Sequence, residues 1–159
     1  MLVSNILQCI GKTPMVNLCM FGLPHVFAKA EHMNPGGSIK DRVARYLIEA
    51  AERDGTLRPG MTIAEATSGN TGIGVAMVGI LKGYRVVIVM PENMSEERRK
   101  IIRAFGGELV FTSAEGSLGE AVAKAREIQS ADPEANIRPS GLKASPSTVS
   151  RCPPRSSFR

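Results

Sequence analysis

From residue 62 to residue 129 the sequence alternates short apolar runs with longer amphipathic or apolar ones. Three runs have the length and composition of buried strands: TIAEA (62–66), RVVIVM (85–90) and ELVFTS (108–113). Three others have helical length: residues 73–83, 95–107 and 117–129. Apolar strands that alternate with helices are typical of a parallel sheet covered on both faces, with right-handed connections. The sequence therefore predicts a three-layer α/β fold.

The region before residue 62 adds two shorter apolar runs and one further helix. Residues 15–20 and 25–30 predict strands joined by a turn around Gly22 and Pro24. A helix is predicted over residues 41–55, since it ends at a glycine and its apolar residues recur at helical spacing. The residues that this spacing places on one face are Val43, Leu47, Ala50 and Ala51.

The net charge of +5 is confined to the C-terminal end of the chain. From residue 135 onward there are five basic residues and no acidic one, which leaves 15 basic against 15 acidic residues in 1–134. Residues 137–159 hold six serines and four prolines without apolar periodicity. Such a segment buries too little surface to offset its ordering entropy. We predict an irregular or disordered basic tail and do not expect the charge to mark a nucleic-acid-binding protein.

Membrane, secreted and metal-binding classes have little support in the sequence. No apolar run reaches the roughly 18 residues of a membrane span, and the N-terminus lacks the pattern of a secretory signal. Cys9, Cys19 and Cys152 are too few and too widely spaced for a disulfide framework or a zinc site. His25 and His32 lack partners at metal-binding spacing. We expect a cytoplasmic protein with no membrane contact and no metal.

Two short segments fail as catalytic motifs of other families. In IGKT (10–13), the earlier glycine of a P-loop would fall at Ile6, and no strand precedes it. Around Ser68, Ala66 and Asn70 occupy the glycine positions of the GxSxG motif. Neither P-loop nucleotide binding nor serine hydrolysis is expected.

TSGNTGIG (67–74) is a stronger candidate because it lies between a predicted strand and a predicted helix. Its glycines allow backbone N–H groups to converge on an anion at the helix N-terminus. On spacing alone, a tight turn without function fits equally well. The hydroxyls of Thr67, Ser68 and Thr71 add donors and favour a site for a carboxylate or phosphate.

NPGGSIKDR (34–42) places Lys40 where two glycines and a serine precede a predicted helix. The positive end of a helix disfavours a cation, and a neutral amine is what Schiff-base chemistry requires. Glycines also let the backbone approach a ligand closely. The alternative is a solvated charge at a helix start; the context makes Lys40 a candidate catalytic residue.

Three long motifs in this order and spacing carry a family resemblance. NPGGSIKDR, EATSGNTGIG and MPENMSEERRK together resemble the cysteine synthase (O-acetylserine sulfhydrylase) and cystathionine β-synthase family of pyridoxal-phosphate enzymes. IGKTPMVNL and AFGGELVFT also match the family pattern. The resemblance covers residues 5–136 and implies the tryptophan synthase β-like fold, known as fold type II.

The resemblance implies roles for individual residues. Lys40 resembles the lysine that carries pyridoxal 5′-phosphate covalently, and Asn70 resembles the asparagine that hydrogen-bonds the cofactor ring. Five residues match the loop that binds the substrate carboxylate: Thr67, Ser68, Gly69, Asn70 and Thr71. The implied activity is that of a transferase in cysteine biosynthesis, in which O-acetylserine and sulfide give cysteine and acetate.

Two alternatives to this activity stay open. One is cystathionine β-synthase-type activity. The other is a catalytically inactive, truncated remnant that acts through association with full-length homologues. The partners implied by the resemblance are a small-molecule amino-acid substrate, a second copy in a homodimer, and serine acetyltransferase.

The resemblance also implies a truncated chain in three parts. Residues 1–40 would hold two strands of a second domain and end at the cofactor lysine, 41–136 would form the small α/β domain, and 137–159 the tail. The family's loop for the cofactor phosphate and its serine at the pyridine nitrogen have no visible counterpart. Without the second domain, the early strands are expected to expose their apolar side chains.

Overall fold

The computed structural model describes residues 2–116 and 118–131. Its four helices are α1 (Lys40–Arg53), α2 (Asn70–Leu81), α3 (Glu96–Ala104) and α4 (Leu118–Ala131). Its strands are β1 (Met15–Asn17), β2 (Phe27–Lys29), β3 (Thr62–Ala66), β4 (Arg85–Pro91) and β5 (Glu108–Thr112). Three short 3-10 helices precede α1: η1 (Ile6–Cys9), η2 (Cys19–Phe21) and η3 (Glu31–Met33). The predicted tail over 137–159 lies outside the described residues.

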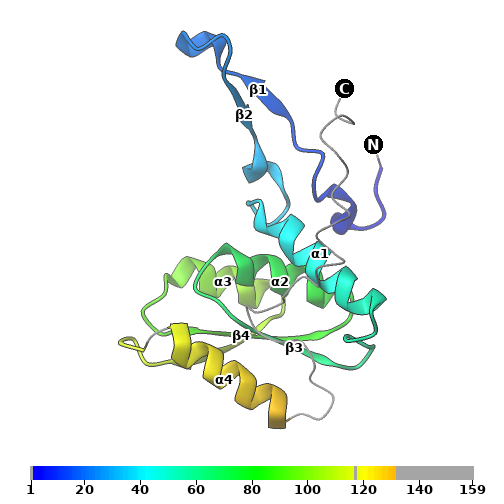
Figure 1. Ribbon diagram of the computed structural model, residues 1–159, viewed down its shortest axis with the longest axis vertical. Helices are drawn as coiled ribbons and strands as arrows, with labels where there is room; N and C mark the ends of the chain where they lie inside the picture. The colour runs from blue at the N-terminus through cyan, green and yellow to red at the C-terminus, as the bar shows by residue number, and fades with distance from the viewer. Residues whose placement is uncertain (1, 117, 132–159) are drawn as a thin grey trace.

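The body is a three-stranded parallel sheet with helices on both faces. The strand order is β3-β4-β5, and in the central strand Val87 pairs with Ala64 on one side while Val89 pairs with Val110 on the other. Helix α4 covers one face, and α1, α2 and α3 lie on the other, with α2 packed against the sheet (Figure 1). The predicted three-layer α/β fold is confirmed.

Helix α2 is the centre of the larger core. Every residue from Gly72 to Gly79 is buried, because the helix is enclosed by the sheet, α1 and α3. A helix that is apolar all round is expected at such a position. The side chains of Ile63, Met77 and Ile88 are among the most deeply buried in this core.

The predicted start of α2 and the predicted buried face of α1 are corrected. Helix α2 begins at Asn70 rather than at residue 73, because the Gly72 N–H donates to the Gly69 carbonyl oxygen at 3.0 Å and closes a first turn within the glycine-rich segment. The buried residues of α1 agree with the predicted face only at Ala51: they are Asp41, Ala44, Ile48 and Ala51. The small side chain of Ala44 permits close contact with α2, and Val43 is 37% exposed.

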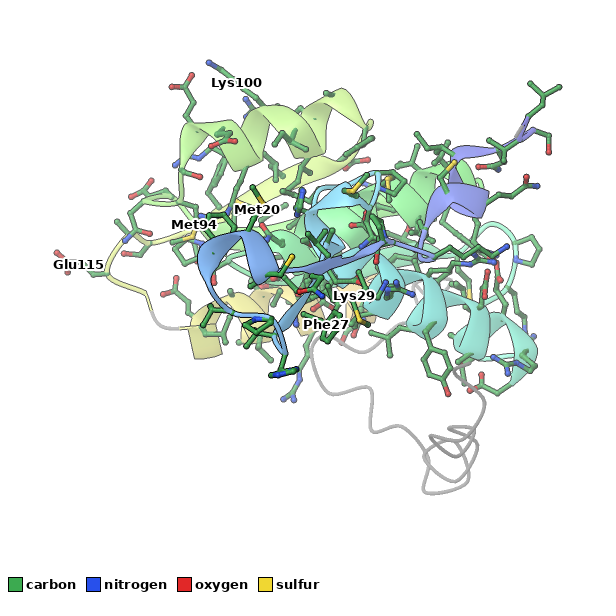
Figure 2. All side chains as sticks on the ribbon, turned by 90° about the horizontal axis from the view of Figure 1, so that it is seen from above. Met20, Phe27, Lys29, Met94, Lys100 and Glu115 are labelled. Carbon is green, nitrogen blue, oxygen red and sulfur yellow. The ribbon has the colours of Figure 1, made fainter. Side chains whose placement is uncertain are left out.

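The strands β1 and β2 form a separate antiparallel hairpin that projects from the body (Figure 1). Both are shorter than predicted. Residues 19–21 form η2 and Gly22 adopts a left-handed conformation (φ 74°), and a turn in which the Val26 N–H donates to the Leu23 carbonyl oxygen at 3.2 Å precedes β2. We call residues 15–29 the arm. Its exposed large apolar side chains are Met15, Val16, Met20, Phe21, Leu23, Val26 and Phe27. Two of them, Met20 and Phe27, are labelled in Figure 2. The exposure predicted for the early strands is confirmed.

A polar network around Glu31 fastens the arm to the body. The Arg42 guanidinium donates to the Glu31 carboxylate through Nε at 2.7 Å and Nη2 at 2.9 Å. Thr13 Oγ1 donates to the same carboxylate at 2.6 Å, and Asn34 Nδ2 at 2.9 Å. Lys29, at the end of β2, donates to Thr13 Oγ1 at 2.6 Å. Bidentate Arg–carboxylate pairs are geometrically specific, so this network fixes how the arm leaves α1.

Acid is expected to loosen the arm before it loosens the sheet. The hydrogen bonds from Arg42 and Thr13 hold the pKa of the Glu31 carboxyl far below its ordinary value of 4.5. A depressed folded-state pKa means that ionised Glu31 stabilises the attachment above pH 4.5, and that this contribution is lost progressively as the pH falls below that value. Hydrogen exchange, corrected for intrinsic rates, should therefore show residues 13–34 losing protection at a higher pH than β4.

The matched variants for this prediction are Glu31→Gln and Glu115→Gln. Glu31→Gln should weaken arm protection already at neutral pH and remove its acid dependence. Glu115 lies on an exposed loop away from the arm (Figure 2), so Glu115→Gln should behave like the unmodified chain. Equal loss of protection in the arm and in β4 would contradict the expected order.

Candidate functional site

The N-terminal ends of α1 and α2 pack against each other at the carboxyl end of β3. A Cβ atom placed on Gly74 would lie 3.0 Å from the Lys40 carbonyl oxygen and 3.2 Å from the Ala44 Cβ. Gly74 lies one turn after Asn70 and Thr71, on the same side of α2. The first turn of α1, which carries Lys40, therefore lies beside the turn that the sequence singled out.

A cavity of about 410 Å³ opens next to this contact. It is lined by Val43 and Leu47 of α1, Glu65 and Ala66 of β3, Thr67, Ser68 and Thr71 of the following turn, and Leu118 of α4. The cavity brings together three of the predicted carboxylate-binding residues. Lys40 lies one turn before Val43 on the same side of α1, but Lys40, Gly69 and Asn70 are not among the residues that line the cavity.

The turn between β3 and α2 leaves donors available to a ligand. The Thr67 N–H donates to the Val89 carbonyl oxygen at 3.0 Å, which continues the β3–β4 ladder and anchors the start of the turn. The residue that caps α2 is Gly69, which has no side chain to bond the first amides of the helix, and its own N–H donates to Thr67 Oγ1 at 3.4 Å. Ser68 and Asn70 are exposed. Uncapped amides at a helix N-terminus, with hydroxyls beside them, form a favourable site for an anion.

Lys40 is the first residue of α1, and its side chain is exposed. Its backbone N–H donates to Ser38 Oγ at 3.1 Å, so the serine of NPGGSIKDR caps the helix amide at the lysine itself. Asn70 lies in the equivalent position, as the first residue of the neighbouring helix. Lys40 and Asn70, the two residues predicted to contact the cofactor, are thus the first residues of two adjacent helices.

Sequence reasoning did not identify Asp41 as part of this region. Its side chain is fully buried, and Oδ2 accepts the Gly36 N–H at 2.5 Å. Its Oδ1 has no hydrogen-bond partner among the described residues. Burial raises the pKa of the Asp41 carboxyl, and the Gly36 N–H acts in the opposite direction. No signal in the sequence separates a buried aspartate at this position from an exposed one.

The cavity walls Val43, Leu47 and Leu118 were also missed as site residues. Helical periodicity assigned the first two to the core, and it has no means to distinguish a core from a cavity wall. In the described part of the chain, no three His, Cys, Asp or Glu side chains gather as ligands of a metal ion would. Over the same residues, no helix combines the length and apolarity needed to cross a membrane.

Comparisons with known proteins place these features in a family. The family described as pyridoxal-phosphate dependent enzyme matches residues 6–148, which extends beyond residue 136, where we placed the end of the resemblance. A cysteine synthase of Staphylococcus aureus (strain N315) is 50% identical over 130 residues, covering 80% of this chain and 42% of the relative. A cysteine synthase of a Flavobacterium species is 48% identical over 136 residues, covering 84% and 44%.

Solved structures agree with the sequence relatives. An O-ureido-L-serine synthase superposes with a TM-score of 0.79 at 44% identity, covering 84% of this chain and 43% of that one. An O-acetylserine dependent cystathionine β-synthase from Helicobacter pylori superposes with a TM-score of 0.79 at 34% identity, covering 86% and 46%.

These matches confirm fold type II, and the chain spans 42–44% of the length of the cysteine synthases named above. The relatives include enzymes named for different products, so these matches identify the family and do not identify one reaction. On the matched range and the shared fold, the chain belongs to the family of pyridoxal-phosphate dependent enzymes.

Proposed function

We propose that this chain carries the lysine-bearing part of a cysteine synthase-type active site. The reaction would be a β-replacement in which O-acetylserine and sulfide give cysteine and acetate. The observation that carries the proposal is the packing of the Lys40 turn of α1 against the uncapped first turn of α2. That packing supports the proposal because it brings the turn that carries Lys40 next to the helix start that follows Thr67 and Ser68.

The residues present fit the pyridoxal-phosphate cofactor of the family. Lys40 offers an exposed primary amine for a covalent bond, and Asn70 offers an amide for the cofactor ring. When bound, the cofactor supplies an electron sink for charge developing at the substrate Cα. The group that would bind the cofactor phosphate is not among the residues assigned here.

The turn from Thr67 to Thr71 would hold the substrate carboxylate. Thr67, Ser68 and Thr71 would supply hydroxyls, and Gly69 and Asn70 would supply backbone amides at the start of α2, where the Gly69 N–H donates to Thr67 Oγ1 at 3.4 Å in this structure. Fixing the carboxylate there would orient the substrate Cα–H bond toward the Lys40 amine, which would remove the proton. The apolar walls Val43, Leu47 and Leu118 would limit water around the reacting atoms.

Cysteine formation tests the proposal. The full chain is incubated with pyridoxal 5′-phosphate, O-acetyl-L-serine and sulfide, and cysteine is quantified. We expect cofactor-dependent cysteine formation that Lys40→Ala abolishes and Lys100→Ala preserves, because Lys100 lies on α3 and points away from the body (Figure 2). No cysteine from the unmodified chain, under conditions in which a full-length cysteine synthase is active, would contradict it. L-Serine with homocysteine in place of these substrates tests the cystathionine β-synthase alternative.

A second candidate is an inactive chain that associates with full-length homologues. It is favoured by the exposed apolar side chains of the arm, which include Met20 (79% exposed), Phe21 (69%) and Phe27 (57%). Co-purification with a full-length cysteine synthase, lost in Phe21→Ser/Phe27→Ser, would support it. We also propose that the arm belongs to a second domain, that residues 41–136 form the small α/β domain, and that the protein is cytoplasmic. A homodimer and a contact with serine acetyltransferase are proposed on the same family resemblance.

A further inference from the structure

Asp41 and Lys40 are adjacent in sequence but lie in opposite environments. Lys40 is exposed at the start of α1, whereas Asp41 has no accessible surface. The Asp41 carboxylate turns back onto the loop that leads into the helix, where Oδ2 accepts the Gly36 N–H at 2.5 Å. A Cβ atom on Gly36 would overlap the Asp41 carboxylate, so the loop backbone is in direct contact with it.

Further hydrogen bonds fix the segment before Lys40. The Gly37 N–H donates to the Asn34 carbonyl oxygen at 2.8 Å, and the buried Asn34 side chain accepts the Gly11 N–H at 2.8 Å. On the far side of α1, Gly74 allows the Lys40 carbonyl to approach α2. The Lys40 backbone therefore lies against α2 at Gly74, and the loop that leads into it is bound by the Asp41 carboxylate.

Burial of the Asp41 carboxylate with so few hydrogen bonds is unfavourable in free energy. The carboxylate has one backbone N–H for two oxygens, and Oδ1 has no partner among the described residues. Burying a carboxyl without full hydrogen bonding is unfavourable, and an apolar or small residue would avoid that cost. A simple interaction with the helix N-terminus does not require burial, because exposed acids provide it equally well.

We propose that Asp41 is a positioning residue for Lys40: by holding the Gly36 amide it fixes the loop 36–40 and the direction in which the Lys40 side chain leaves α1. The inference rests on the proposed function in that Lys40 is taken as the reactive lysine. Asp41 itself touches neither substrate nor cofactor in this scheme.

Two substitutions at Asp41 separate positioning from a general effect on the fold. Asp41→Asn keeps an oxygen that accepts the Gly36 N–H, whereas Asp41→Ala removes it. The matched control is Asp54→Ala at the other end of α1, where the Asp54 carboxylate likewise accepts a backbone N–H, that of Thr56 at 3.0 Å. Circular dichroism checks that each variant of the full chain is folded.

The first readout is site-specific labelling. Each variant is treated with pyridoxal 5′-phosphate, reduced with borohydride and mapped by mass spectrometry, and the ratio of label on Lys40 to label on Lys100 is measured. Asp41→Ala is expected to lower this ratio roughly tenfold or more, since small misplacements of a reactive group have large effects on rate. Asp41→Asn and Asp54→Ala should keep the ratio of the unmodified chain. An unchanged ratio in a folded Asp41→Ala would overturn the inference.

The second readout needs no cofactor. Hydrogen exchange of residues 36–40 should show lost protection in Asp41→Ala and retained protection in Asp41→Asn, and equal protection in both would overturn the inference. If the unmodified chain shows no preference for Lys40 over Lys100, the proposed function fails, while hydrogen exchange still decides whether Asp41 holds the loop. Should Asp41→Ala not fold, Gly36→Ala, which displaces the carboxylate, takes its place with the same expected losses.

Discussion

Replacing Ile88 by alanine is expected to lower the free energy of unfolding by about 2–5 kcal/mol. Ile88 lies in the central strand β4 with no accessible surface, and its Cγ2 atom would lie 3.2 Å from a Cβ placed on Gly72 of α2. The substitution leaves a cavity between the sheet and the helix that carries the candidate site. Since domains are stable by only about 5–15 kcal/mol in total, this loss is a large fraction of the stability of the fold.

Urea denaturation followed by circular dichroism measures this loss. The matched control is Leu81→Ala at the end of α2, where the side chain is 44% exposed and the change should stay within about 0.5 kcal/mol. Similar losses for the two substitutions would mean that the core does not lie between the sheet and α2.

Replacing Gly74 by valine is the second substitution with a large expected effect. The Cβ of residue 74 would lie 3.0 Å from the Lys40 carbonyl oxygen, which is backbone and has little freedom to move, so the two helices must separate. Overpacking of this kind costs about 1–3 kcal/mol of stability. Because the separation falls at Lys40 itself, labelling of this lysine by pyridoxal 5′-phosphate should fall roughly tenfold or more relative to Lys100.

Gly79→Val is the matched control on the same helix. A Cβ there would lie 2.6 Å from Val86 Cγ2 and 3.1 Å from Ile63 Cδ1, so the crowding is similar but is directed at the sheet. Gly79→Val should therefore lower stability without a selective loss of labelling at Lys40. If both variants lost Lys40 labelling in proportion to their stability, the α1–α2 contact would have no particular role in the site.

The strands of the body could be predicted because their signal is local. Strand β3 has the predicted bounds, and β4 and β5 differ from prediction by one residue each, since continuous apolar runs between turn residues define buried parallel strands. Thr67, Ser68 and Thr71 were predicted to bind a carboxylate from their position after a strand and before a helix. They line one cavity, and their binding role stays a prediction.

Other features depend on contacts between distant segments and left no local pattern. The Glu31 network joins residues as far apart in the sequence as Thr13 and Arg42, and no local sequence pattern distinguishes its members from other polar residues. The burial of Asp41 follows from how the loop at Gly36 folds back, which periodicity does not describe. The buried face of α1 was predicted correctly only at Ala51, because the close contact with α2 buries the small Ala44 and leaves Val43 exposed.

The central claim is that Lys40 is the residue that bonds the cofactor, and one measurement tests it most directly. The full chain is mixed with a small excess of pyridoxal 5′-phosphate, reduced with borohydride, and the modified lysines are quantified by peptide mass spectrometry. We predict that the label lies mainly on Lys40 and that Lys40→Ala leaves only weak, scattered labelling. Label spread over Lys100, Lys124 and the other exposed lysines without preference for Lys40 would contradict the claim.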